Sequence, residues 1–99
     1  MLNIEKKIEG DKACFALEGR LDTVTSPELE EAIKESIEGI ADLSMDFEKL
    51  EYISSAGLRV LLATQKIMNR QGSMKVVNVN EVIGEIFEVT GFSDILNIE

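Results

Sequence analysis

Residues 51–62 read EYISSAGLRVLL, a stretch in which two serines and a glycine interrupt an otherwise apolar run. The segment before it, DLSMDFEKL (residues 42–50), alternates apolar and polar side chains, which predicts a strand with one polar face. After the serines, apolar residues recur with helical spacing as far as about Asn69, and Gly72 ends the pattern. The stretch therefore marks the point at which a strand gives way to a helix.

Upstream of this junction, the sequence predicts two strands and a helix. LNIEKKIEG (residues 2–10) and KACFALEGRL (residues 12–21) read as strands, and the short connection between them favours an antiparallel hairpin. Ser26 is a good N-cap for the helix that follows, and Pro27 suits its first position. Gly39 is the expected end of this helix.

Downstream, MKVVNV (residues 74–79) reads as a strand, and Asn80 can cap a third helix that ends at Gly91. The residues expected on the buried side of this third helix are Val82, Ile83, Ile86 and Phe87. The tail DILNIE (residues 94–99) could add a short edge strand.

The order of these elements predicts an α/β fold. Strand–helix–strand connections of this length normally give parallel strand pairs with right-handed crossovers. We therefore expect a single mixed β-sheet of four to five strands, with an N-terminal antiparallel hairpin followed by parallel strands, and helices packed mainly on one face. The other face must then be partly polar or covered by something else. A chain of 99 residues can bury a single core, so residues 1–99 are expected to form one domain.

Composition excludes several classes of function. The formal charge is −9, from 19 acidic and 10 basic residues, and no Lys/Arg cluster is present, which argues against direct nucleic-acid binding. No apolar run approaches the roughly 20 residues of a membrane span, and the charged N-terminus shows no secretory signal. The lone cysteine, Cys14, fits a reducing cytosol, and we interpret it as a small core residue of a cytoplasmic protein.

The absence of histidine weighs against catalysis. Serine nucleophiles are usually activated by a histidine base, and zinc sites usually contain His/Cys clusters; this chain offers neither. A nucleophile elbow would need glycine where Ile53 stands. Asp46 could suggest the phospho-acceptor of a response regulator, but its place in an alternating segment predicts a mid-strand residue on a polar face. We expect no enzyme activity, no metal and no other cofactor.

Ligand sites of open α/β sheets lie beyond the carboxyl ends of the strands. Two loops fit this position, residues 19–26 and residues 52–57, because each follows a predicted strand and precedes a predicted helix. Ser54 and Ser55 have a structural interpretation as helix caps and a functional one as phosphorylation sites, since the free N–H groups of a helix start also suit a phosphate. Asp22 has two interpretations as well: it can bond the backbone of its own turn, or it can position or repel an approaching partner.

The chain resembles a known family, the STAS domain, and within it the bacterial anti-sigma factor antagonists. The resemblance covers nearly the whole chain. The first family motif, a Gly-x-Leu-Asp turn, is seen here as GRLD (residues 19–22), and the second, commonly Asp-Ser-Ser/Thr-Gly-Leu, is matched by SSAGL (residues 54–58). Each motif is weak alone, but together, with the right spacing and element order, they are strong.

This resemblance implies a switch protein without catalysis of its own. In the family, a serine kinase that is also the anti-sigma factor phosphorylates the serine after the motif aspartate, which corresponds to Ser55 when Gly57 is aligned. The unphosphorylated form binds the kinase and frees the sigma factor, and a PP2C-type phosphatase restores that form. Ser54 stands where the pattern has aspartate and Ala56 where it has a second hydroxyl, which makes Ser54 an alternative acceptor.

The physical chemistry of the two loops leads to a hypothesis for how the partner is bound. Docking would use the loop edge and the first turn of the second helix, and the residues expected to take part are Asp22, Thr23, Ser54, Ala56, Gly57 and Arg59. A phosphate there would break the complex by local charge, with little refolding. The alternative is a passive STAS interaction module of a larger signalling complex, in which Ser54 and Ser55 act only as helix caps. The protein is expected to be a monomer or a weak dimer.

Overall fold

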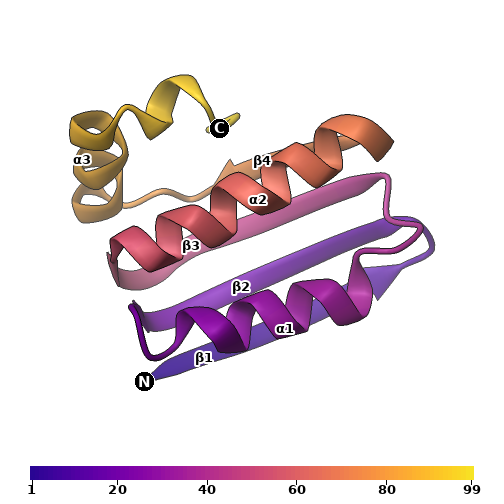
Figure 1. Ribbon diagram of the computed structural model, residues 1–99, viewed down its shortest axis with the longest axis horizontal. Helices are drawn as coiled ribbons and strands as arrows, with labels where there is room; N and C mark the ends of the chain where they lie inside the picture. The colour runs from indigo at the N-terminus through magenta and orange to yellow at the C-terminus, as the bar shows by residue number, and fades with distance from the viewer.

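Four strands form one sheet in the computed structural model, which describes residues 1–99 (Figure 1). In chain order the elements are β1 (Leu2–Glu9), β2 (Lys12–Leu21), α1 (Ser26–Ser36), β3 (Asp42–Ile53), α2 (Ser55–Gln71), β4 (Ser73–Val77), α3 (Glu81–Thr90) and a 3-10 turn, η1 (Phe92–Asp94). The strands lie in the order β1-β2-β3-β4; β1 pairs with β2 antiparallel, and the other pairs are parallel. The predicted mixed sheet is therefore confirmed.

The last predicted strand is reduced to a single bridge. Val76 of β4 pairs with Ile98, and two backbone bonds hold this bridge: Val76 N–H to Asn97 O (2.8 Å) and Glu99 N–H to Val76 O (2.9 Å). The preceding residues cannot extend it, because η1 turns the chain and Leu96 is buried in the core. The tail therefore covers only a short part of the edge of β4.

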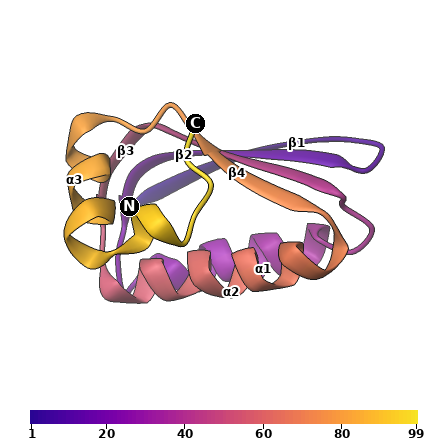
Figure 2. The same ribbon diagram turned by 90° about the horizontal axis from the view of Figure 1, so that it is seen from above.

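The core lies between the sheet and two helices. Figure 2 shows α1 and α2 side by side under one face of the sheet, while α3 crosses the end of the two layers. A single cluster of 22 buried apolar residues fills the space, with Phe15, Met45 and Phe47 from the strands and Leu61 and Met68 from α2 among the fully buried side chains. Each such side chain contributes about 1.5–3 kcal/mol by leaving water. The helices are thus held against one face by the alternating apolar residues of the strands.

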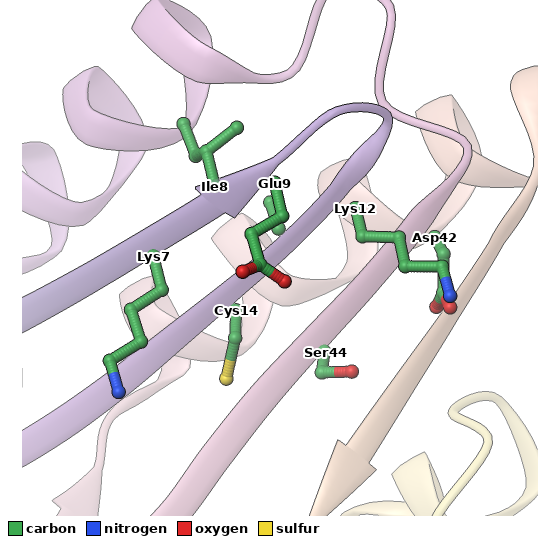
Figure 3. A pocket seen from close by; sticks show the side chains of 8 residues that line it. Lys7, Ile8, Glu9, Lys12, Cys14, Asp42 and Ser44 are labelled. Atoms are coloured by element: carbon green, nitrogen blue, oxygen red, sulfur yellow. The ribbon is translucent and has the colours of Figure 1, made fainter.

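The opposite face of the sheet carries no helix and is mostly polar. Register places Lys7, Cys14, Ser44 and Lys75 in one row across the four strands. Figure 3 shows Lys7, Cys14 and Ser44 on this face, around an open hollow of about 560 Å³. The interpretation of Cys14 as a core residue is wrong, because its neighbours Ala13 and Phe15 point into the core. Partial burial, followed by the nearby Asp46, raises the pKa of the Cys14 thiol.

Three local predictions about the helices are also wrong. The N-cap of α1 is Thr25, because the Ser26 hydroxyl turns back to donate to the Asp22 carbonyl instead of capping the helix. The same helix ends at Ser36, and Gly39 lies in the following turn with φ +81°. Val82 is 56% exposed, since α3 crosses the end of the sheet and only part of its surface reaches the core.

Asn80 fastens α3 to the sheet. Beyond the Asp46–Val77 pair, β3 continues without β4 beside it. The Asn80 side chain covers part of this free edge: its Nδ2 donates to the carbonyls of Leu50 (2.8 Å) and Phe47 (3.2 Å). Its Oδ1 accepts from Ile83 N–H (3.0 Å), which confirms the predicted cap of α3. One side chain therefore caps a helix and satisfies strand carbonyls.

None of the helices is long and apolar enough to span a membrane.

Candidate functional site

The two loops singled out in the sequence meet at one end of the sheet. The Ser54 N–H donates to the Leu21 carbonyl (2.8 Å), which ties the start of α2 to the end of β2. Gly57 makes this approach possible, because a Cβ at that position would lie 2.8 Å from Leu21 Cγ and 3.0 Å from Ile53 Cγ2. Gly57 is itself buried, so its contribution is the close packing of α2 rather than an exposed contact.

Asp22 organises the turn between β2 and α1. Its Oδ1 accepts hydrogen bonds from the backbone N–H groups of Val24 and Thr25, both at 3.0 Å. The Thr25 hydroxyl accepts from Asp22 N–H (2.8 Å) and donates to the Arg20 carbonyl (2.8 Å). Hydrogen bonding, first from Thr25 N–H, lowers the pKa of the Asp22 carboxyl below its ordinary value. The structural interpretation of Asp22 is therefore correct, and the turn it fixes leaves Thr23 and Val24 exposed.

Ser54 and Ser55 have different environments. Ser54 is the N-cap of α2, with an extended backbone, and its Oγ accepts from Gly57 N–H (3.3 Å). Ser55 is the first residue inside the helix; it is exposed, and its hydroxyl has no hydrogen-bond partner in the chain. Capping thus occupies the Ser54 hydroxyl and leaves the Ser55 hydroxyl free.

The backbone around Ser55 is suited to negative charge. The Ser54 hydroxyl oxygen accepts from Gly57 N–H, and the Ser54 carbonyl accepts from Leu58 N–H. The backbone N–H groups of Ser55 and Ala56 have no acceptor in the chain. Free N–H groups and the positive end of the helix dipole both favour an anion at this position. The first turn of α2 carries no acidic residue that would oppose it.

A shallow hollow lies between α1 and α2, and its lining includes Ala56, the residue after Ser55. Its volume is about 380 Å³, and it brings together Thr23, Ala56 and Arg59 from the predicted site with Glu30 of α1. Arg59 is exposed and stands one helical turn after Ser55, so both side chains emerge from the same side of α2. The hollow is open, which suits a protein contact better than the enclosure of a small substrate. No group of three or more acidic or cysteine side chains is arranged to hold a metal ion.

Arg20 and Tyr52 form a contact next to Asp22 that the sequence did not reveal. The Arg20 guanidinium lies 4.5 Å from the centre of the Tyr52 ring, and its Nε is 4.0 Å from Asp22 Oδ2. Both side chains are exposed. They face each other because two register shifts between β2 and β3 bring Arg20 opposite Tyr52. Bulges of this kind leave no reliable sign in a single sequence, although the Arg and the aromatic residue next to each motif could have been noted.

Comparison with known proteins gives matches over almost the whole chain. The model of the STAS domain family matches residues 3–99. The anti-sigma-B factor antagonist of Staphylococcus epidermidis is 32% identical over 99 residues, which cover 98% of this chain and 92% of that protein.

Two solved structures have a similar fold. An anti-sigma factor antagonist from Mycobacterium paratuberculosis has a TM-score of 0.88 at 22% identity, covering 99% of this chain and 85% of that one. The Bacillus cell fate determinant SpoIIAA in its phosphorylated form has a TM-score of 0.74 at 17% identity, covering 100% of this chain and 91% of that one. At these identities the two structures are evidence for the fold alone.

Proposed function

The chain belongs to the STAS domain family, and from this premise we propose that it is an anti-sigma factor antagonist switched by phosphorylation of Ser55. In its unphosphorylated form it binds an anti-sigma factor that is also a serine kinase, and the sigma factor is released. A PP2C-type phosphatase removes the phosphate and restores binding. The protein acts in the cytoplasm by binding and has no catalysis of its own.

The division of roles between the two serines carries this proposal. Ser54 caps α2, so its hydroxyl oxygen already accepts a hydrogen bond from Gly57 N–H. Ser55 is exposed and unbonded, so its modification breaks no hydrogen bond. This contrast favours Ser55 as the acceptor even though serine, rather than the usual aspartate, precedes it.

Local charge accounts for the switch. The kinase transfers the γ-phosphoryl group of ATP to Ser55 Oγ, which loses its proton, and ADP leaves. The phosphatase hydrolyses the phosphate ester, which gives back serine and releases inorganic phosphate. The phosphoserine adds about −1.5 to −2 charges. The free N–H groups at the start of α2 and the Arg59 side chain can neutralise part of this charge within the protein. A partner surface shaped for a neutral hydroxyl would be repelled, because a dianion is costly to desolvate.

The docking surface that we propose surrounds Ser55. It consists of Asp22, Thr23, Ser54, Ala56, Gly57 and Arg59. We also include Arg20 and Tyr52, because the Arg20 guanidinium lies over the Tyr52 ring and next to Asp22. Gly57 contributes by positioning its neighbours, since it is buried. The Asp22 hydrogen bonds hold the first loop in one conformation before binding, which reduces the entropy lost on association.

The second candidate function is a passive interaction module without a phospho-switch. The observation in its favour is the departure from the family motif at Ser54, whose hydroxyl is used as a cap. One experiment separates the two functions: the protein is incubated with ATP and an anti-sigma factor that is a serine kinase, and phosphate is located by mass spectrometry. We expect label on Ser55, no label on Ser55→Ala, and label on Ser54→Ala. Absence of phosphate, or equal labelling of Ser55→Ala, would refute the switch at Ser55.

A further inference from the structure

Helix α3 presents three stripes of side chains, and the fold uses only one of them. The buried stripe consists of Ile83 and Phe87. The second, which we name the apolar stripe, consists of Val82, Ile86 and Val89. The third, which we name the acidic stripe, consists of Glu81, Glu85 and Glu88. The acidic stripe is exposed, and in the apolar stripe Val82 and Val89 are exposed while Ile86 is partly buried.

The apolar stripe has the form of a docking face. Its members follow the spacing i, i+4, i+7, which aligns them along one side of the helix. Val82 is 56% exposed and Val89 is 78% exposed. Ile86, which lies between them, is partly buried and packs against the core, so its position is fixed. Single exposed apolar side chains are ordinary on protein surfaces, whereas apolar side chains aligned on one side of a helix match the anchor spacing by which helices dock into partners.

The surroundings of α3 leave room for a partner. The helix crosses the end of the molecule, with its outer side away from the sheet and from α1 and α2 (Figure 2). Beside Val82 an open hollow of about 430 Å³ separates the start of α3 from the end of β3. The charged residues that border this hollow are Glu48, Lys49, Glu51 and Glu81, so acidic groups predominate there.

Charge identifies the kind of partner. The acidic stripe precedes the apolar stripe by one residue at each position, so the two run side by side along α3. The helix contains three glutamates and no lysine or arginine. Nucleic acid and anionic lipid surfaces would be repelled by this face. In an antiparallel pairing of two copies through the apolar stripe, both acidic stripes would lie on the same side and repel each other.

We propose that α3 docks a basic amphipathic segment of a partner protein. The apolar side of that segment covers Val82, Ile86 and Val89, and its Lys or Arg side chains face Glu81, Glu85 and Glu88. This surface is made of residues other than those around Ser55, and it gives the protein a second place for a protein contact.

The test uses a synthetic Leu/Lys amphipathic helix as the probe and a Leu/Glu helix of the same pattern as its control. Calorimetric titration of the intact protein should show binding of the Leu/Lys probe only. The double variant Val82→Ser/Val89→Ser should bind it at least about tenfold more weakly, because two exposed valines lose their burial. Both positions are exposed, so the variant should keep the thermal unfolding midpoint of the parent protein.

Matched charge variants separate a specific site from general attraction to an acidic protein. Glu85→Lys/Glu88→Lys on α3 should weaken binding, whereas Glu31→Lys/Glu35→Lys on α1, with the same change in net charge, should not. Backbone amide shifts caused by the probe should concentrate in residues 81–90. Equal weakening by both charge variants, or unchanged affinity of the valine variant, would overturn the proposal. Ser55→Ala should bind the probe like the parent protein, so failure of the phospho-switch would leave this test intact.

Discussion

The different roles of Ser54 and Ser55 should be measurable as a difference in stability. Ser54→Ala removes the only side-chain bond at the start of α2, the 3.3 Å bond from Gly57 N–H. Loss of an N-cap typically costs about 1 kcal/mol. For a domain of this size, that loss corresponds to a fall of about 4–8 °C in the thermal unfolding midpoint. Ser55→Ala removes an exposed hydroxyl without a partner, so its effect should stay within about 0.5 kcal/mol.

Circular dichroism during thermal unfolding measures both variants under the same conditions. Ser54→Asp is the matched control, because aspartate is also a good N-cap and places negative charge at the positive end of the helix. This variant should be at least as stable as the parent protein. The reasoning would be refuted if Ser54→Ala had the unfolding midpoint of the parent protein, or if Ser55→Ala lowered the midpoint more than Ser54→Ala. Ser54 would then not be the stabilising cap, and the assignment of Ser55 as the phosphorylation site would lose its structural support.

Three further perturbations test the frame around the site. Asn80→Ala should lower the free energy of unfolding by about 2 kcal/mol in urea titrations, because the cap of α3 and the bond to the Leu50 carbonyl are both lost. Asn80→Asp keeps only the cap and should also be less stable than the parent protein. If Asn80→Asp is as stable as the parent, the bonds from Asn80 to the strand carbonyls do not stabilise the fold. Gly57→Ala should lower the free energy of unfolding by about 1–3 kcal/mol, because the new methyl group would crowd the Leu21 side chain. A higher free energy of unfolding in this variant would contradict the close packing of α2 on Leu21. Asp22 has a lowered pKa in the folded protein, so its contribution is present above the ordinary value of 3.8 and disappears as the pH falls through the folded-state pKa. The midpoint difference between the parent and Asp22→Asn should therefore be constant near neutral pH and shrink in acid, and a difference independent of pH would exclude the carboxylate as its source.

The sequence was sufficient to predict most of the architecture. Alternation in residues 42–50 and helical spacing after Ser55 placed the strand and helix that meet at the site, and both motifs lie at the same end of the sheet. These features are local, and local periodicity can be read without knowing the rest of the fold. Asn80 was predicted as a cap for the same reason.

The errors arise where tertiary packing decides. Val82 fits the apolar pattern of α3, but that helix crosses the end of the sheet and buries a narrower stripe than a helix lying flat. Cys14 lies in an apolar run that conceals its alternation, so the side of the strand it occupies could not be recognised. The contact of Arg20 with Tyr52 depends on register shifts within the sheet. Such long-range geometry is not encoded in any one segment.

The free Ser55 hydroxyl has a consequence for how fast the switch can respond. A modifying enzyme that needs a buried or bonded side chain must wait for a spontaneous opening of its substrate, and the waiting time then follows the stability of the fold. Ser55 lies on the surface with no bond to break, so under the proposed switch the folded protein would already be a competent substrate. Encounter with the kinase and the chemistry itself should therefore set the pace of phosphorylation, and variants that stabilise the fold elsewhere should leave that rate unchanged.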